Sequence, residues 1–248
     1  MTGFAHCIIL PSYNSGSALA RTIQAIIPSG VPVWVIIDAS TDGSQHALGP
    51  MEDSVRVTLL STNGGKGSAV LVGMRAALAA GYTHALVMDA DGQHDVNSLL
   101  PFIRISMENP DAMVLGVPIF GPDAPPERVN GRRIGNCFAN IETHWLGVRD
   151  SLFGFRIYPI KQSLRILESI RTARRFDFDT ELAVRLVWAG VRPINIETPV
   201  FYPHTNDGGV THFRYLRDNL LLIWTHARLI CGMVLRVPRL LRLRKEWT

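Results

Sequence analysis

Short apolar runs alternate with helix-like segments between residues 7 and 89 of the chain. The apolar runs are residues 7–10, 33–37, 55–60 and 85–88. The helix-like segments between them are residues 17–27, 45–48 and 68–80, with Ser17 as the expected cap of the first. Buried strands that alternate with helices indicate an α/β protein whose central sheet is mainly parallel and flanked by helices.

The second half of the chain gives a weaker pattern. Prolines are frequent between residues 118 and 130, which is typical of a mobile loop. Beyond it, the spacing predicts a helix over about 131–146, a strand over 155–158 and a helix over 179–189. The sequence contains no internal repeat and no low-complexity segment.

Composition and charge indicate that the chain consists of a main domain and a basic tail. Its 248 residues are 47% apolar, enough to fill the core of one large domain. The net charge is only +4, but the basic excess lies late in the sequence. We therefore expect a main domain at residues 1–212 and a basic amphipathic helical tail at residues 213–248. Three scattered cysteines indicate a reducing compartment, and we expect neither a secretory signal nor a transmembrane segment.

Two carboxylates follow the fourth apolar run directly. Asp89 and Asp91 enclose Ala90, and a glycine turn then leads to Gln93 and His94. Ligands bind at the carboxyl ends of strands in open α/β sheets, and Mg²⁺ favours one or two carboxylates together with substrate phosphates. The segment is therefore a candidate metal and phosphate site, although such a pair is also typical of a solvated turn.

Two further segments suggest a nucleotide site. Asp38 ends the second apolar run, where a carboxylate can contact a base or ribose, but its segment also fits a capped turn. The glycine-rich residues 63–68 look like a phosphate loop, yet Gly67 stands where that loop requires Ser or Thr. Lys66 or this turn therefore either lines a nucleotide site or serves only the local structure.

Charged residues in the second half are candidates for phosphate binding or for catalysis. The arginines with donors suited to phosphate oxygens are Arg128, Arg132, Arg133 and Arg156. Ordinary surface charge is the alternative for each of them. Asp150 precedes a glycine turn, while Asp179 and Glu181 lie at the start of a predicted helix, where Asp179 also fits an N-cap. His204 and His212 flank a pair of glycines, with a structural role as the alternative for each.

In this order, the segments resemble a family-two glycosyltransferase of GT-A fold, nearest the polyprenyl- or dolichyl-phosphate mannosyltransferase branch. The matching segments are residues 10–14, 38–44, 63–69, 89–94, 150–156 and 178–181. The resemblance implies a Rossmann-like nucleotide-binding half joined to an acceptor half. It also implies inverting transfer from a GDP- or UDP-sugar to a lipid or lipid-phosphate acceptor, with Mg²⁺ or Mn²⁺ as cofactor.

The resemblance further implies roles for individual residues. Nucleotide-sugar contacts would come from Pro11, Tyr13, Asn14, Asp38, Lys66, Asp89, Ala90 and Asp91. The metal ligands would be Asp89, Asp91, Gln93 and His212. A hydroxyl acceptor needs a general base, for which Asp150 comes first and Asp179 second, with Glu181 as a further catalytic candidate. A phosphate acceptor is already anionic and needs the four arginines named above more than a base.

Three of the motifs depart from the family pattern. Ile37 replaces the first acid of Asp-Asp-Gly-Ser, and His212 replaces the lysine of Gly-x-Ser-Lys, where it could meet the metal or diphosphate instead. Phe153 replaces the Ser or Thr that precedes Gly-Phe-Arg. An apolar group then stands where a hydroxyl would meet an acceptor phosphate, so the acceptor stays open.

Apolar and basic residues interleave from residue 212 to 245, which is typical of an amphipathic helix at a membrane surface. A helix that packs on the main domain or meets an oligomer partner is the alternative, and a dimer stays open. We therefore expect a cytoplasmic enzyme, peripheral on the inner face of the cell membrane, that does not bind nucleic acid. The alternative functions are a sugar-nucleotide nucleotidyltransferase and a non-catalytic membrane-associated nucleotide-sugar-binding protein.

Overall fold

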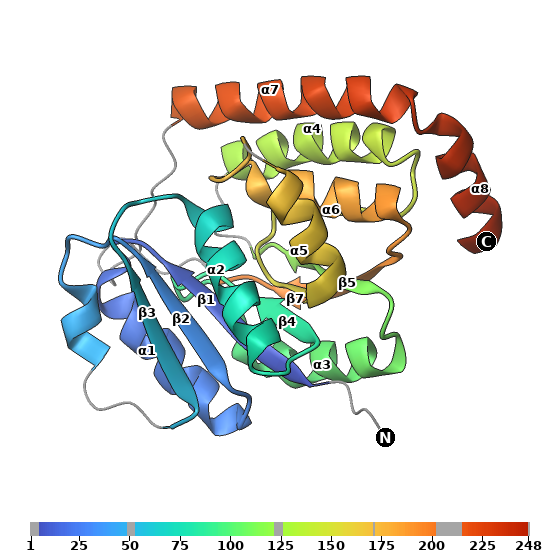
Figure 1. Cartoon of the computed structure of the whole chain (residues 1–248). Helices are drawn as coiled ribbons and strands as arrows, with labels where there is room; N and C mark the ends of the chain where they lie inside the picture. The colour runs from blue at the N-terminus through green and yellow to red at the C-terminus, as the bar shows by residue number, and fades with distance from the viewer. Residues whose placement is uncertain (1–4, 49–52, 122–125, 171, 202–214, 248) are drawn as a thin grey trace.

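A central sheet lies between two layers of helices (Figure 1). The computed structural model describes residues 5–48, 53–121, 126–170, 172–201 and 215–247. Across the sheet, the strands are β3 (Val55–Leu60), β2 (Val33–Asp38), β1 (His6–Ser12), β4 (His84–Val87), β6 (Arg156–Pro159), β5 (Met113–Ile119) and β7 (Pro193–Pro199). Only β6 runs antiparallel to its neighbours, β4 and β5, so the predicted mainly parallel sheet is confirmed.

Alternate residues of β1 point into two separate cores, because helices cover both faces of the sheet. Ile9 packs with α2 (Lys66–Ala79), α5 (Ile160–Ser169) and α6 (Phe178–Ala189). Ile8 packs on the other face with α1 (Gly16–Ile26) and α3 (Leu99–Glu108). Both isoleucines are fully buried, as expected for a parallel strand covered on both faces. Three short 3₁₀ helices complete this part: η1 (Ile27–Ser29), η2 (Ser44–Leu48) and η3 (Val96–Ser98).

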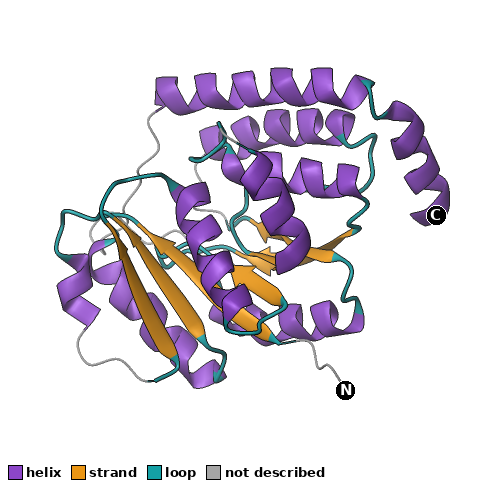
Figure 2. Cartoon of the chain, viewed as in Figure 1, coloured by secondary structure: helices purple, strands orange, loops and turns teal. Residues whose placement is uncertain are grey.

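Two sequence expectations about helix starts are wrong. The loop expected over residues 118–130 is shorter, because β5 continues to Ile119 and α4 (Pro126–Glu142) begins well before residue 131. Proline is favoured in the first turn of a helix, where its missing N–H has no intrahelical partner to lose. Ser17 lies inside α1, not at its cap, and its hydroxyl accepts a hydrogen bond from Arg21. Figure 2 shows the resulting pattern of helices and strands.

The C-terminal segment forms two helices, α7 (Tyr215–Val234) and α8 (Val237–Trp247). Helix α7 lies along α4 and also contacts α6 (Figure 1). The expected boundary between residues 212 and 213 lies outside the described residues. No single described helix is long and apolar enough to cross a bilayer; α7 from Arg217 and α8 reach that length and composition only as a pair, with a bend of 83° between them.

The strand order reverses between β1 and β4, which positions the site. The chain moves outward from β1 to β2 and β3, and then returns to add β4 on the other side of β1. The carboxyl ends of such divergent parallel strands flank a crevice where α/β proteins bind ligands. Asp89 follows β4, and Tyr13 follows β1 at the same end of the sheet.

Candidate active site

Lys66 connects two carboxylates from different parts of the fold. Its Nζ atom lies 2.7 Å from Oδ1 of Asp89 and 2.6 Å from Oδ2 of Asp179. Asp89 follows β4, and Asp179 lies in the first turn of α6. Burial opposes the charged ammonium, but the two carboxylates outweigh it and raise the pKa of Lys66. The lysine is therefore held as a cation between the two acids.

Gly154 forms the wall behind this lysine. A Cβ atom at residue 154 would clash with Oδ2 of Asp89 and would lie 2.7 Å from Nζ of Lys66. The backbone of the Gly-Phe-Arg segment therefore lies directly against the ion pair. A side chain at this position would displace one of the two charged groups.

Asp89 and Asp91 make a locally negative site. Burial opposes ionisation of Asp89, but the Lys66 ammonium and His94 hold the pKa of the Asp89 carboxyl well below its usual range. Burial and the Asp89 charge raise the pKa of Asp91, whose Oδ1 atom accepts a hydrogen bond from the Gln93 N–H at 3.0 Å. Ala90 between them is buried. A bound cation would relieve the repulsion between the two carboxylates.

His94 is a residue whose role the sequence did not predict. Its ring is buried against Phe153 and Phe155, and its Nε2 atom lies 3.5 Å from Oδ2 of Asp89. Its Nδ1 atom has no hydrogen-bond partner among the residues that the structure describes. The signal that could have identified it is its position directly after the acidic motif, on a turn that returns toward Asp89.

These residues fit a hard divalent cation as a partial ligand set. Within the described residues, no three His, Cys, Asp or Glu side chains are arranged to hold a metal ion together. Two carboxylates are nevertheless what Mg²⁺ or Mn²⁺ needs from the protein when substrate phosphates supply further oxygens. Gln93 follows on the same turn, with its carbonyl accepting from the Phe201 N–H, whereas the expected ligand His212 lies outside the described residues.

Asp38 ties the glycine-rich turn to β2. Its two carboxylate oxygens accept hydrogen bonds from the backbone N–H groups of Gly64 and Gly65, at 2.8 and 2.7 Å. Gly65 has a φ of +86°, and a Cβ atom there would clash with the carbonyl of Arg174, so the turn requires glycine. These two N–H groups are therefore bonded to Asp38. Through them the carboxylate holds the start of α2 in place, and with it the backbone of Lys66.

The loop after β1 is joined to the loop after β2. Asn14 has a φ of +48°, its Oδ1 atom accepts from the Thr41 N–H at 2.7 Å, and its own N–H donates to Ser40. This arrangement leaves Tyr13 at the surface and Pro11 buried at the end of β1. The expected nucleotide-contacting residues other than Lys66, which begins α2, thus lie at the carboxyl ends of β1, β2 and β4.

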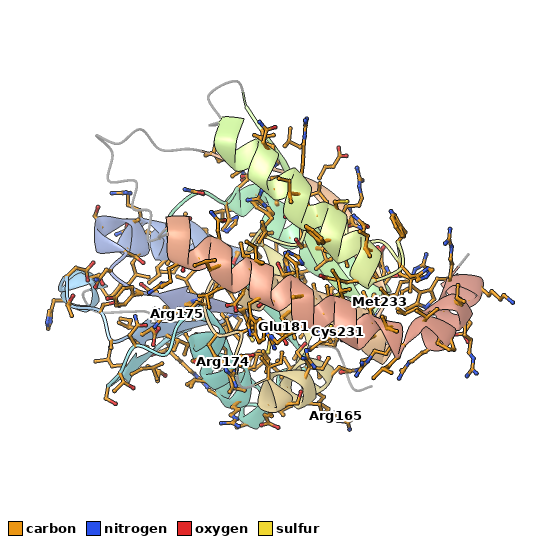
Figure 3. All side chains as sticks on the ribbon, turned by 90° about the horizontal axis from the view of Figure 1, so that it is seen from above. Arg165, Arg174, Arg175, Glu181, Cys231 and Met233 are labelled. Atoms are coloured by element: carbon orange, nitrogen blue, oxygen red, sulfur yellow. The ribbon has the colours of Figure 1, made fainter. Side chains whose placement is uncertain are left out.

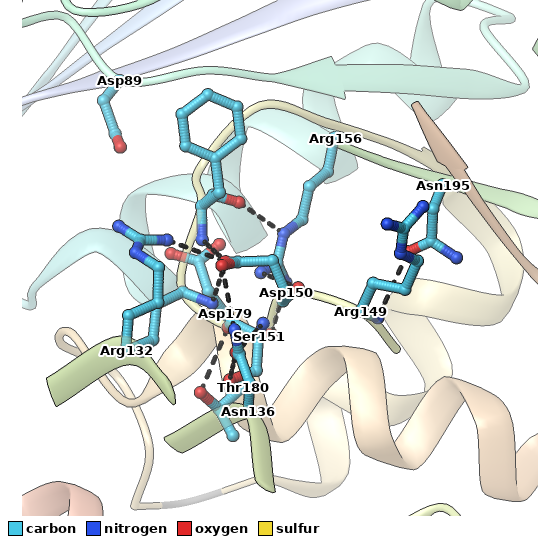
Figure 4. Close-up of polar contacts among 12 residues, drawn as sticks. Asp89, Arg132, Asn136, Arg149, Asp150, Ser151, Arg156, Asp179, Thr180 and Asn195 are labelled. Carbon is cyan, nitrogen blue, oxygen red and sulfur yellow. Dashed lines mark hydrogen bonds and ion pairs between the residues drawn. The ribbon is translucent and has the colours of Figure 1, made fainter. Parts of the chain in front are cut away.

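Asp150 is surrounded by donors (Figure 4). Its Oδ1 atom accepts from Arg132 at 2.7 Å and from the N–H groups of Leu152 and Phe153 at 2.9 and 2.7 Å. Its Oδ2 atom accepts from Asn136 at 3.1 Å. A carboxylate with four donors is poorly placed to take a proton from an acceptor, and here it fastens the turn before β6 to α4.

The four arginines expected to bind phosphate differ in their surroundings. Arg156 is fully buried and donates to the carbonyls of Phe153, Asp179 and Asp150, at 2.6, 2.7 and 3.3 Å. It therefore joins the segments of the site and does not face an acceptor. Arg132 pairs with Asp150, and Arg133 is exposed on α4. The backbone of Arg128 belongs to α4, but its side chain lies outside the described residues.

Asp179 and Glu181 point in different directions, because residues two apart on a helix do not share a face. Asp179 faces Lys66, whereas Glu181 is fully buried and pairs with Arg185 at 2.7 Å and with Arg228 of α7 at 2.6 Å. Seen from above, Glu181 lies under α7 (Figure 3). The structure therefore places Glu181 in a contact between α6 and α7, and not beside Lys66 and Asp89.

Comparison with known proteins identifies the family to which the chain belongs. A family model described as "Glycosyl transferase family 2" matches residues 7–167, more than half of the chain. The chain belongs to glycosyl transferase family 2. The match extends from Cys7 in β1 through β6, so Lys66, Asp89, Asp91 and Gly154 lie within it, and Asp179 lies beyond it. The expected α/β class, the family and the activity of a glycosyltransferase are thus confirmed.

Of three relatives of this family 2 glycosyltransferase, two have names that state a lipid phosphate. Glycosyltransferase AglJ of Haloferax volcanii is 28% identical over 219 residues, 86% of this chain and 68% of that protein. The UDP-N-acetylglucosamine–dolichyl-phosphate N-acetylglucosaminyltransferase of Methanococcus voltae is 24% identical, over 78% of this chain and 83% of that protein. The undecaprenyl-phosphate mannosyltransferase of Micrococcus luteus is 26% identical, over 76% and 80%.

A solved structure shares the fold of this family 2 enzyme. Glucosyl-3-phosphoglycerate synthase from Mycobacterium tuberculosis, in complex with Mn²⁺, UDP-glucose and phosphoglyceric acid, superposes with a TM-score of 0.62 at 16% identity. The superposition covers 94% of this chain and 79% of that one. The expected GT-A fold is therefore shown over nearly the whole chain.

Proposed function

We propose that this enzyme transfers a sugar, with inversion, from a nucleotide-sugar donor to a lipid phosphate at a membrane surface, with Mg²⁺ or Mn²⁺. The observation that carries the proposal is the position of Asp89 and Asp91 at the carboxyl end of β4, where the strand order reverses. Tyr13 follows β1, which pairs with β4, and Asp38 ends β2 on the other side of β1. We propose that the nucleotide lies against these two strand ends. The names of the relatives support the acceptor class.

The surroundings of the candidate bases favour an acceptor that needs no general base. Both oxygens of Asp150 are occupied by donors, and both oxygens of Glu181 are paired with arginines. Asp179 is buried and is paired with Lys66 through its Oδ2 atom. A lipid phosphate is already an anion and can attack the anomeric carbon directly. The new bond joins that carbon to a phosphate oxygen, while the bond to the diphosphate breaks and its electron pair leaves with the nucleoside diphosphate. No proton has to be removed.

Asp89 and Asp91 would hold the metal, with Gln93 and His212 as further proposed ligands. When bound, the cation neutralises the charge that develops on the leaving diphosphate. Arg132 and Arg133 on α4 are proposed to bind the acceptor phosphate, together with Arg128. Arg132 already lies beside Asp150, so an incoming phosphate would find its guanidinium in a fixed position.

The proposed membrane contact is the outer face of α7. Leu220, Ile223 and Trp224 follow a spacing of three and four residues and are 65%, 65% and 60% exposed. Residues at that spacing share one face of a helix. An exposed apolar face near basic side chains favours the surface of an anionic bilayer. We propose that the enzyme is peripheral on the cytoplasmic face; its oligomeric state is left to experiment.

The test is a transfer assay in vesicles that contain a polyprenyl phosphate, and in matched vesicles that contain the polyprenol. A thermal-shift screen of nucleotide sugars with and without Mn²⁺ first selects the donor, because binding raises the Tm. Transfer to the phosphate but not to the alcohol is expected, and Asp91→Ala should abolish it. Equal use of the alcohol would contradict the proposed acceptor. Unchanged turnover by Asp91→Ala would contradict the metal assignment.

The same assay separates the alternative functions. A sugar-nucleotide nucleotidyltransferase would form its product from a nucleoside triphosphate and a sugar phosphate, with release of pyrophosphate. A non-catalytic binding protein would raise its Tm with a nucleotide sugar but release no nucleoside diphosphate. Release of a nucleoside diphosphate only when the lipid phosphate is present supports the transferase.

A further inference from the structure

Lys66 occupies a carboxylate oxygen that the proposed metal would use. Its ammonium group lies 2.7 Å from Asp89 Oδ1 and 2.6 Å from Asp179 Oδ2, and the side chain is only 17% exposed. The backbone of Gly154 also lies against the ion pair, since a Cβ atom there would be 2.7 Å from Lys66 Nζ. A lysine enclosed in this way is not a solvated surface charge, and its pairing needs an explanation beyond helix packing.

The backbone of Lys66 is held as firmly as its ammonium group. The preceding Gly65 N–H donates to Asp38, and the following Gly67 N–H donates to the carbonyl of Arg174 at 2.9 Å. Motion of the ammonium group is therefore limited to side-chain rotation about a fixed Cα atom. The Oδ1 atom of Asp179 is buried and has no hydrogen-bond partner in the part of the chain that the structure describes. One acceptor for a Lys66 donor is thus already present away from Asp89.

We propose that Lys66 is a resident counter-cation that holds Asp89 in the metal-free enzyme, and that Asp179 takes over the ammonium group when the metal and nucleotide bind. The inference rests on the metal dependence in the proposed function and assigns Lys66 and Asp179 as positioning residues. A divalent cation and an ammonium group repel each other at one carboxylate. Asp179 keeps the displaced lysine paired, so that no buried charge is left without a partner.

The test measures Mn²⁺ binding, not turnover. The loss of free aqueous Mn²⁺ signal in electron paramagnetic resonance gives the Kd of the full chain without nucleotide. Lys66→Met should bind Mn²⁺ at least about tenfold more tightly than the wild type, because a competing charge is gone. The matched control is Arg75→Met, which removes a cation from the exposed Arg75–Glu168 pair on the same helix and should change the Kd by less than about twofold.

The part played by Asp179 is tested by a double-mutant cycle. Asp179→Asn leaves the lysine with Asp89 as its only carboxylate, so Lys66→Met should tighten Mn²⁺ binding by a larger factor in the Asp179→Asn background than in the wild type. If Lys66→Met tightens Mn²⁺ binding by the same factor in both backgrounds, Asp179 does not accept the displaced ammonium group. If Lys66→Met is too unstable for titration, the same competition predicts that Mn²⁺ raises its Tm by more than that of the wild type.

The outcomes separate this inference from the proposed function. Mn²⁺ binding by Lys66→Met that equals or is weaker than wild-type binding would overturn the counter-cation while leaving a metal-dependent transferase intact. Absence of Mn²⁺ binding by every variant, with UDP or GDP also present, would overturn both the counter-cation and the proposed metal dependence. Tighter binding by Lys66→Met together with an unchanged Arg75→Met supports the counter-cation.

Discussion

The backbone of Gly154 lies directly against the carboxylate of Asp89, with no room for a Cβ atom between them. This contact joins the segment before β6 to the acidic motif after β4, 65 positions earlier in the chain. It explains physically why a glycine precedes Phe155 and Arg156. The metal-binding carboxylate proposed above has its position set by a residue that carries no functional group.

Gly154→Ala should therefore damage the site more than the fold. The added methyl group must push aside the Asp89 carboxylate or the Lys66 ammonium, which are the ends of side chains and can move without unfolding the domain. We expect sugar transfer to fall by about two orders of magnitude or more, in line with the cost of misplacing reacting groups by about 1 Å. Initial rates and thermal unfolding measure the two effects.

A matched glycine provides the control. Gly131 lies in α4, and nothing would contact a Cβ atom there within 4 Å. Gly131→Ala should keep wild-type transfer and gain up to about 1 kcal/mol of unfolding free energy from helix propensity. A Gly154→Ala variant with wild-type transfer rates would show that the contact between residues 154 and 89 does not matter for the reaction.

Asp150→Asn should cost stability. The substitution places an NH₂ group opposite the Asn136 donor or opposite the N–H groups of Leu152 and Phe153, and it removes the charge that pairs with Arg132. We expect a loss of about 2–4 kcal/mol in the free energy of unfolding, measured in urea. Asp111→Asn, at an exposed aspartate, should change it by less than about 0.5 kcal/mol.

Asp150→Asn also distinguishes a structural role of Asp150 from a role as general base. An Asp150→Asn protein with wild-type stability, and with a rate that has lost its dependence on an ionised group, would restore Asp150 as the general base. The pH profile of transfer by the folded fraction is the measurement that decides between the two roles.

Ala39→Gly should stabilise the protein. Ala39 has a φ of +53°, in the left-handed region where a Cβ atom is costly and glycine is not. Relief of this strain should raise the free energy of unfolding by about 1 kcal/mol, after the extra chain entropy of glycine is subtracted. Ala76→Gly, inside α2, should lower it by about 1 kcal/mol. Equal losses for both variants would mean that the turn after β2 is unstrained.

Charge on the outer face of α7 should release the enzyme from membranes. Ile223→Glu places a carboxylate on the exposed apolar face, where it meets neither a core nor a partner side chain of the described residues. We expect a loss of binding to anionic vesicles of at least about tenfold in flotation assays, with little change in Tm. Leu100→Glu, on α3 across the sheet and 57% exposed, should bind as the wild type does. Equal losses for both would mean that only net charge matters.

The sequence located the parts of the site that strand ends determine. Asp38 and Asp89 follow buried apolar runs, and their meeting at one edge of the sheet follows from parallel strands. Periodicity could not show that Lys66 reaches Asp179, 113 residues further along, because that contact depends on how α2 and α6 pack. The burial of Arg156 was equally invisible, since an arginine beside a glycine turn looks the same in sequence whether it faces solvent or backbone carbonyls.

Phe153 shows how a substitution can mislead. The sequence placed an apolar ring where an acceptor phosphate would bind, but the ring is buried against His94, and a Cβ atom at Gly116 would clash with it. The Phe153 ring therefore contacts His94, whose Nε2 atom lies 3.5 Å from Asp89. Packing between β5 and the turn before β6 decides this, and no local pattern encodes it.

The pairing of Glu181 with Arg228 means that the C-terminal helix cannot be cut away as an independent module. A chain that stopped before α7 would take Arg228 away from Glu181, which would keep Arg185, and would take His226 away from Glu142 on α4. Both contacts and the packing of α7 against α4 and α6 would be lost together, so we expect the shortened chain to be less stable than the full chain. The segment that we propose to touch the membrane is thus also part of the folding unit that holds α6 and Asp179 of the candidate site.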